Sequence, residues 1–409
     1  MKILIVNSFY FPEIKGGAEY SVKKLAEQLV HNGHSIKIIA AGHIDSNEII
    51  DGVYVSRRKF NSIYHSYNYT EKNFAIKIIH RLLDFNNFFN IKILQKEIQE
   101  FKPDIIPTNN LYEITPVIWK IAHSNNIPVI HTIRDYYLLC PKTTLLKKGN
   151  IHCSNPPIFC KAYQSINRYI SGYVDYLTAP SNMMLEMTSD FCFFQKAHKY
   201  TIYNAAEFNI DKVKNIINNK KEKGFITYIY VGGLYPHKGI RNLIESFELI
   251  NDKKVRLLIA GMGDELEYVK EAEKKDARIV YKGFLKENEL EEILIESDVL
   301  VCPSLWNEPF GRVILDAYKN GLPVIGNKIG ALPELIDHNK TGLLVEANNT
   351  EKLRQAMEYI LFNKEILNKY RKNIPKKLSE FSIEVQRLKF EEIYNRAIKE
   401  KLIRYENKQ

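Results

Sequence analysis

Residues 299–316 read VLVCPSLWNEPFGRVILD. The apolar run at 299–302 is typical of a buried strand, and the apolar residues that follow Gly311 recur at helical spacing. The loop between them carries one acid, Glu308. Because ligands of open α/β sheets bind at the carboxyl ends of the strands, this segment predicts a parallel sheet with a binding loop at its edge.

Strand-like and helix-like segments alternate in the same way along both halves of the chain. The strand-like runs are residues 3–6, 36–40, 104–106, 129–132, 176–179, 225–231, 255–260, 279–281, 299–302 and 323–325. This rhythm predicts parallel βαβ units and a doubly wound sheet in each half. We expect α/β domains at 1–207 and 225–381, a Lys- and Asn-rich linker at 208–224, and a charged helix at 382–409 that packs back toward the N-terminal domain.

Composition and charge narrow the class of protein. The chain has 409 residues, 45% of them hydrophobic and 26% charged, as in folded globular proteins. Lys and Arg outnumber Asp and Glu by 58 to 48, and the net charge of +10 indicates an anionic partner: nucleic acid, phosphate or a membrane surface. No apolar run approaches the roughly 20 residues of a membrane-spanning helix. Five cysteines without an export signal favour the cytoplasm.

A second strand–loop–helix segment, VGGLYPHKG at 231–239, suits a phosphate. Gly232 and Gly233 let the backbone approach closely, and Lys238 supplies a positive charge. In the first segment, Glu308 at the mouth of the helix and Asp316, about two turns along the same face, suit two polyols such as a sugar and a ribose. The alternatives are an ordinary turn at 231–239, a helix cap at Glu308 and a solvated acid at Asp316.

Several short motifs follow one another along most of the chain. They are Gly16-Gly17-Ala18-Glu19, Ala179-Pro180-Ser181, Lys238-Gly239, Glu308 with Asp316 eight residues on, Gly321-x-Pro323, GALPELI at 330–336 and TGLLV at 341–345. In this order and spacing they resemble the retaining glycosyltransferases of family 4. The resemblance implies the GT-B fold: two Rossmann-like doubly wound domains facing across a cleft, an N-terminal one for the acceptor and a C-terminal one for the nucleotide sugar.

The resemblance also implies a role for each matching residue. Lys238 would bind the donor diphosphate and stabilise the departing nucleotide, and Glu308 would face the transferred sugar. Further donor contacts would come from Gly16, Gly17, Gly232 and Gly233 at the phosphates, the backbone of Pro309, Phe310, Gly311 and Arg312, Asp316 at the ribose, and Phe284 and Leu285 at the base. The donor would be a UDP- or GDP-linked sugar, and no cofactor is expected.

The chain departs from the family pattern at four places. Gly233 stands where the family has arginine, Asp316 where it has glutamate, Arg134 where it has a histidine that touches the donor sugar, and Asn204-Ala205 where it has Asn-Gly. We hypothesise that Arg134 offsets the arginine lost at Gly233, which makes it a third catalytic candidate. No Asp-x-Asp motif occurs in the chain, so a metal-bridged diphosphate is not expected. A front-face retaining mechanism is implied by the resemblance alone.

A cysteine-rich insertion raises the question of a metal. Cys140, Cys153, Cys160 and His152 lie close together in sequence and make a weak structural zinc candidate. The paired Cys-x2-Cys spacing is missing, and the alternative is a set of structural cysteines.

Basic and aromatic residues are interspersed between Lys72 and Lys102. A helix pair of this composition on the acceptor domain would suit an anionic membrane surface, where lipid-linked acceptors reside. The alternative is an amphipathic helix packed on its own sheet.

Together these features predict a cytoplasmic, metal-independent retaining glycosyltransferase. If the stretch between Lys72 and Lys102 binds lipid, the enzyme would lie on the cytoplasmic face of the inner membrane. It would move a hexose-type sugar to a hydroxyl of a glycan or lipid-linked acceptor in bacterial surface polysaccharide synthesis. The alternatives are a sugar-nucleotide epimerase or a phosphorylase of the same fold and, from the charge alone, a nucleic-acid-binding protein. No nucleic-acid-binding module is recognisable, so no nucleic-acid partner is expected.

Overall fold

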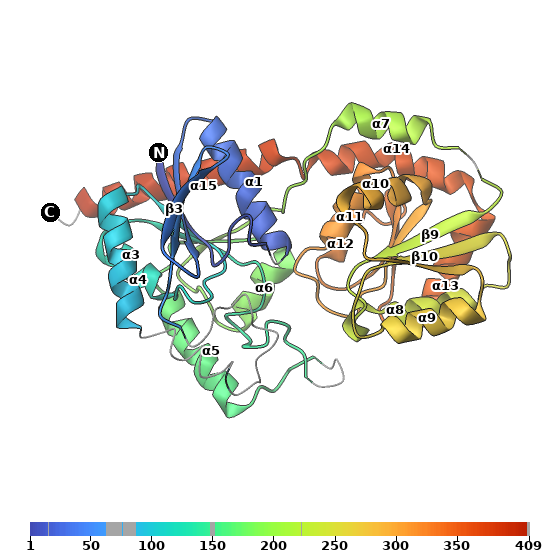
Figure 1. Cartoon of the computed structure of the whole chain (residues 1–409), viewed down its shortest axis with the longest axis horizontal. Helices are drawn as coiled ribbons and strands as arrows, with labels where there is room; N and C mark the ends of the chain where they lie inside the picture. The colour runs from blue at the N-terminus through green and yellow to red at the C-terminus, as the bar shows by residue number, and fades with distance from the viewer. Residues whose placement is uncertain (15, 63–75, 77–86, 148–151, 222, 407–409) are drawn as a thin grey trace. The chain divides into compact units, whose positions relative to one another are not determined.

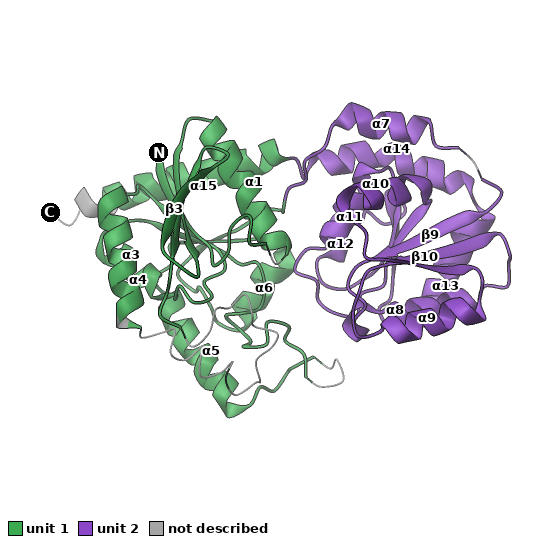
Figure 2. Ribbon diagram, in the orientation of Figure 1, with its two compact units in different colours: residues 1–204, 383–409 green, residues 205–382 purple. Residues whose placement is uncertain are grey.

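The computed structural model describes residues 1–14, 16–62, 76, 87–147, 152–221 and 223–406 (Figure 1). The chain divides into two compact units (Figure 2). Unit 1 comprises Met1–Asn204 and Ile383–Gln409, and unit 2 comprises Ala205–Ser382. Each unit has its own sheet and its own core, as the alternating pattern predicts.

Unit 1 is built on an eight-stranded sheet with the order β3-β4-β2-β1-β5-β6-β7-β8. Its elements are β1 (Lys2–Val6), α1 (Gly17–His31), β2 (Ser35–Ala41), β3 (Ser46–Ile50), β4 (Val53–Arg58), α3 (Phe88–Phe101), β5 (Ile106–Thr108), α4 (Val117–Ser124), β6 (Val129–Thr132), α5 (Ile158–Ser171), β7 (Tyr176–Ala179), α6 (Asn182–Asp190), β8 (His198–Thr201) and α15 (Ile383–Glu406). Neighbouring strands are parallel except for β3, which pairs antiparallel with β4 at the edge. Phe390 and Tyr394 of α15 are buried in the same core as β1, β2 and α1.

Unit 2 is built on a six-stranded parallel sheet with the order β11-β10-β9-β12-β13-β14. Its elements are α7 (Ile210–Asn218), β9 (Ile226–Val231), η2 (Pro236–Lys238), α8 (Ile240–Glu248), β10 (Val255–Ala260), α9 (Leu266–Lys275), β11 (Ile279–Gly283), α10 (Glu287–Glu296), β12 (Val299–Cys302), α11 (Arg312–Lys319), β13 (Val324–Asn327), α12 (Leu332–Leu335), β14 (Gly342–Val345), α13 (Thr350–Phe362) and α14 (Glu365–Ser379). Chain order along this sheet reverses between β9 and β12, which places the binding crevice of a doubly wound fold at their carboxyl ends.

The predicted linker at 208–224 is wrong in one respect, because it contains helix α7 and belongs to unit 2. The Asn209 side chain accepts hydrogen bonds from the backbone N–H groups of Asp211 and Lys212 at 2.9 and 3.1 Å, which caps the helix. Val213 is buried, and α7 packs against α14. Asn209 thus starts a helix where the Lys- and Asn-rich composition indicated an irregular segment.

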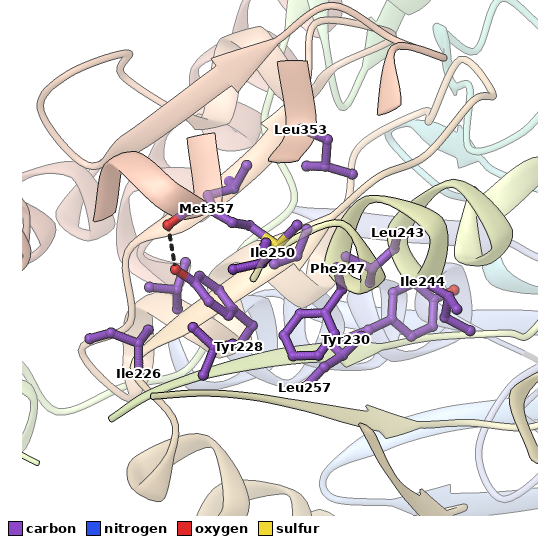
Figure 3. Close-up of a cluster of buried hydrophobic side chains, with 14 of the residues drawn as sticks. Ile226, Tyr228, Tyr230, Leu243, Ile244, Phe247, Ile250, Leu257, Leu353 and Met357 are labelled. Carbon is purple, nitrogen blue, oxygen red and sulfur yellow. Dashed lines mark hydrogen bonds between the residues drawn. The ribbon is translucent and has the colours of Figure 1, made fainter. Parts of the chain in front are cut away.

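Strand β9, which leads into the 231–239 loop, is buried in the core of unit 2. Tyr228 and Tyr230 of β9 are buried against apolar side chains of α8, such as Phe247 (Figure 3). The Tyr228 hydroxyl donates to the Met357 carbonyl of α13 at 2.6 Å, and the Tyr230 hydroxyl donates to the Gly233 carbonyl at 2.7 Å. Each bond satisfies a buried hydroxyl, so together they position the end of β9 and the loop that follows it.

Candidate functional site

A pocket of about 190 Å³ lies in unit 2 at the point where the strand order reverses. The ends of β9 and β12 and the start of α11 line it. Five of the predicted site residues line this pocket, namely Gly232, Lys238, Glu308, Gly311 and Arg312. Lys238 and Glu308, which are 70 positions apart in the loops after β9 and β12, meet because parallel strands present their carboxyl ends at one edge of the sheet.

The lining of the pocket includes an ion pair. Lys238 Nζ lies 2.6 Å from Glu308 Oε1, and the Ser304 hydroxyl donates to the same carboxylate oxygen at 2.9 Å. The Glu308 side chain is 11% exposed, whereas the Lys238 side chain is 26% exposed. Lys238 Nζ also lies 5.1 Å from the centre of the Trp306 ring, within cation–π range. These contacts give the pocket a positioned cation that can meet an anionic ligand, and a carboxylate that can accept hydrogen bonds from hydroxyl groups.

The loop that carries Glu308 is held by close backbone contacts. Gly239 has φ +75°, and a Cβ at this position would lie 1.9 Å from the Pro303 carbonyl oxygen. Gly330 has φ +59°, and a Cβ there would lie 2.4 Å from the backbone nitrogen of Glu308. The Asn327 amide donates to the Pro303 carbonyl at 2.8 Å. Neighbouring segments of unit 2 therefore determine where the carboxylate sits.

The pKa values of two titratable side chains next to the ion pair are shifted toward their neutral forms. Burial, followed by the charge of Lys238, lowers the pKa of His237 below its ordinary value. Its ring stacks on Tyr235 with centroids 5.7 Å apart. Burial, followed by the Glu308 carboxylate, raises the pKa of Cys302 to about 12. Both shifts favour the uncharged form of the side chain.

Asp316 does not share a helix face with Glu308, contrary to the prediction. Helix α11 begins only at Arg312, so Glu308 precedes it in the loop. Asp316 lies on α11, where its carboxylate is 3.4 Å from Lys319 Nζ. It does not line the pocket described above.

Five other predicted donor contacts of unit 2 also lie outside the lining of this pocket: Gly233, Phe284, Leu285, Pro309 and Phe310. The Phe284 side chain is 72% exposed just after β11. Phe310 is buried, and its ring contacts Phe381 at a centroid distance of 6.1 Å. The Phe310 side chain therefore packs in the core of unit 2.

The three predicted site residues of unit 1 come from the first turn of α1 and the segment after β6. Arg134 is buried, its Nε donates to Asn109 Oδ1 at 3.0 Å, and its Nη1 donates to Asn204 Oδ1. Glu19 of α1 accepts from the backbone N–H of Gly16 at 2.9 Å. Burial raises the pKa of Glu19, while the charge of Arg134 acts in the opposite direction. The Gly16–Gly17 turn and Arg134 thus belong to one electrostatic neighbourhood.

The zinc candidate at Cys140, Cys153, Cys160 and His152 is not supported. Among the residues that the structure describes, no group of three or more His, Cys, Asp or Glu side chains is placed to hold a metal ion. Burial, followed by Cys140 and Cys153, raises the pKa of Cys160, so the thiols are neighbours. His152, however, is exposed while Cys140 is buried, and the four side chains do not form a common site.

The basic and aromatic stretch from Lys72 to Lys102 lies partly outside the described residues, which here include 76 and 87–102. In α3, which falls in this range, Leu94 and Ile98 are buried within unit 1, as the packed-helix alternative predicts for that part.

Three residues at or beside the pocket were given no role from the sequence: Ser304, which lines it, and Trp306 and His237, which lie next to Lys238. All three fall inside the two strand–loop–helix segments. Ser304 stands two residues after the end of β12, where informative loop residues are expected in this fold. That position is a usable signal for Ser304, whereas the contact of Trp306 with Lys238 depends on the path of the loop.

Comparison with known families covers nearly the whole chain. Residues 15–208 match Glycosyltransferase Family 4, and residues 211–377 match Glycosyl transferases group 1. A 42.6 kDa protein in the cps region of Klebsiella pneumoniae is 32% identical over 337 residues, which are 82% of this chain and 87% of that protein. A glycosyltransferase of Methanocaldococcus jannaschii is 27% identical over 395 residues, 93% of this chain and 95% of that protein.

Solved structures agree on the fold. Anabaena HepE in complex with UDP superposes with a TM-score of 0.70 at 18% identity, covering 97% of this chain and 100% of that one. Sucrose-phosphate synthase from Thermosynechococcus elongatus superposes with a TM-score of 0.70 at 17% identity, covering 97% and 98%. The predicted fold class is confirmed, and the chain belongs to glycosyltransferase family 4, with the two open α/β sheets of the GT-B fold.

Proposed function

We propose that this glycosyltransferase moves a hexose-type sugar, with retention, from a nucleoside-diphosphate sugar to a hydroxyl of a glycan or lipid-linked acceptor. The observation that carries the proposal is the Lys238–Glu308 pair in the switch-point pocket of unit 2. The relative in the cps region of Klebsiella pneumoniae supports surface polysaccharide synthesis as the setting. The complexes of Anabaena HepE with UDP and with UDP-glucose support a nucleoside-diphosphate sugar as the donor, UDP- or GDP-linked.

In this proposal the donor diphosphate binds between Lys238 and the N-terminal turn of α11. Both Gly311 and Arg312 line the pocket there, and helix N-termini favour anions. As the bond between the anomeric carbon and the phosphate oxygen breaks, negative charge grows on the leaving diphosphate. Lys238 stabilises that charge, so no metal ion is needed for this task.

Glu308 would accept hydrogen bonds from hydroxyl groups of the transferred sugar. Ser304 and Lys238 both contact the same carboxylate oxygen, which positions the group before the sugar arrives. Asp316 would take the ribose hydroxyls, and Phe284 with Leu285 would edge the base. Unit 1 would bind the acceptor, with the Gly16–Gly17 turn toward the donor phosphates.

A thermal-shift panel of UDP, GDP, ADP and CMP tests the nucleotide. We expect one nucleoside diphosphate, of which UDP is the first candidate, to raise the Tm in the presence of EDTA, because binding stabilises the folded state. Ligand at 100 times its Kd stabilises by about 2.7 kcal/mol. In Glu308→Ala, the diphosphate should still raise the Tm, whereas the additional stabilisation by its sugar conjugate should be lost. If no nucleotide raises the Tm of the wild type, the proposal is wrong.

Substitution of Arg134 tests whether this cation of unit 1 compensates for the arginine that is missing at position 233. We expect Arg134→Ala to lower kcat/KM for the donor by about 10- to 100-fold, since a preorganised cation near the leaving group is lost. Asn109→Ala serves as control, because it removes a hydrogen-bond partner of Arg134 but keeps the charge. Circular dichroism verifies folding. Unchanged kcat and KM in folded Arg134→Ala would contradict the compensation.

A further inference from the structure

Helix α5 of unit 1 has a polar face turned inward. Gln164 and Asn167 are buried, and their side-chain amides donate to the carbonyls of Leu139 and Leu138 at 2.7 and 3.0 Å. Tyr163 is buried beside them, and its hydroxyl donates to the Tyr137 carbonyl at 2.6 Å. The segment 137–139 has an irregular backbone, and this face of α5 supplies hydrogen-bond donors to three successive carbonyls.

Helix α5 lies at the periphery of unit 1 (Figure 2). The face turned away from these carbonyls carries large exposed apolar side chains. Ile158 is 76% exposed, Phe159 66%, Ile166 41% and Tyr169 74%. At about 100° per residue, these four positions fall within roughly 100° of the helix circumference. They form one stripe, which we call the α5 stripe. Large apolar side chains gathered on a surface mark a site of interaction, whereas scattered ones do not.

Positive charge lies on one flank of the α5 stripe and in the segment that precedes the helix. No acidic residue occurs in the sequence between Asp135 and Asp175. The basic residues of that segment are Lys142, Lys147, Lys148, Lys161 and Arg168. Lys161 and Arg168 lie on one flank of the stripe and are exposed, as are Lys142 and Lys147 in the preceding segment. An apolar stripe with a basic rim is complementary to a bilayer whose headgroups are anionic.

We propose that α5 lies in the interface of an anionic membrane, with the α5 stripe inserted at headgroup level. The helix has 14 residues and is about 21 Å long, a length that suits a helix lying in the plane of the bilayer. Among the described residues, no helix is long and apolar enough to cross a membrane. This assigns the lipid contact to α5, a surface different from the stretch between Lys72 and Lys102.

The membrane contact rests on the proposed function only for its role, which is to bring unit 1 to acceptors that reside in a membrane. Membrane binding itself requires neither donor nor turnover. A failure of membrane binding and a failure of nucleotide binding are therefore separate results, since the nucleotide pocket is lined by residues of unit 2 alone.

Co-sedimentation of the full chain with vesicles tests the membrane contact. We expect binding to vesicles of phosphatidylcholine mixed with phosphatidylglycerol, little binding to phosphatidylcholine alone, and weakening by added salt. Ile158→Asn combined with Phe159→Asn should weaken binding at least about tenfold, since two large apolar side chains no longer enter the membrane. The matched control is Ile44→Asn combined with Ile49→Asn, which alters two exposed isoleucines of the same unit and should bind like the wild type.

A second measurement reports on the stripe directly. Tyr169→Trp places an indole on an exposed position, and its emission should shift to shorter wavelength with phosphatidylglycerol vesicles. The proposal is overturned if the wild type does not bind anionic vesicles, or if the Ile158/Phe159 variant binds them with the same affinity as the wild type. It is also overturned if gel filtration shows a dimer that this variant dissociates, because the stripe is then an interface between copies of the chain.

Discussion

Replacing Lys238 with alanine is expected to reduce kcat by about 100- to 1,000-fold, with a smaller change in the KM for the donor. The physical reason is that charge accumulates on the leaving diphosphate only as the glycosidic bond breaks. A fixed cation therefore stabilises the transition state more than the bound donor. Steady-state kinetics with the donor identified by the thermal-shift panel provides the measurement.

Structural side effects of Lys238→Ala are separable from loss of the charge. Removal of the ammonium leaves Glu308 with the Ser304 hydroxyl, so the carboxylate keeps one of its two contacts. Lys253→Ala is the matched control, because Lys253 is an exposed lysine of the same unit in the loop that precedes β10, at the opposite end of the sheet. Comparable activity of Lys238→Ala and Lys253→Ala would mean that Lys238 does not act on the leaving group.

Gly239→Ala is expected to lower the Tm of unit 2 by roughly 6–12 °C and to abolish nucleotide binding. The added Cβ would lie 1.9 Å from the Pro303 carbonyl oxygen, so the loop after β12 must move. That movement breaks the hydrogen bond from the Leu305 N–H to the His237 carbonyl, now 2.9 Å long. We estimate at least about 3 kcal/mol, and each kcal/mol lowers the Tm by about 2–4 °C for a unit of this size.

Gly283→Ala separates backbone strain from the steric clash. Gly283 has φ +71°, close to that of Gly239, but nothing lies within 4 Å of a Cβ at this position. Its substitution should cost only the left-handed conformation, about 1–2 kcal/mol. Differential scanning calorimetry of both variants gives the comparison. Equal shifts in Tm would show that the contact between Gly239 and Pro303 does not hold the loop.

Most of the fold follows from local patterns. Buried strands such as β9 and β12 are continuous apolar runs, and the loops after them carry the glycines and charges. Helix α7 was missed because nine of the 17 residues at 208–224 are Lys or Asn, although Ile210, Val213 and Ile217 recur at helical spacing within it. Asp316 was placed by counting residues along a helix, and the count failed because nine loop residues, 303–311, separate β12 from α11.

The sequence by itself determined that Lys238 and Glu308 would follow two parallel strands, because strand and helix periods are local properties of the chain. Only the tertiary structure decided that these strands are neighbours and that Ser304 joins the pair, since the distances depend on strand order and on the contacts of Gly239 and Gly330. The same holds for α5. Periodicity gives a helix two faces, but which face is buried depends on what lies beneath it, and here three backbone carbonyls select the polar one.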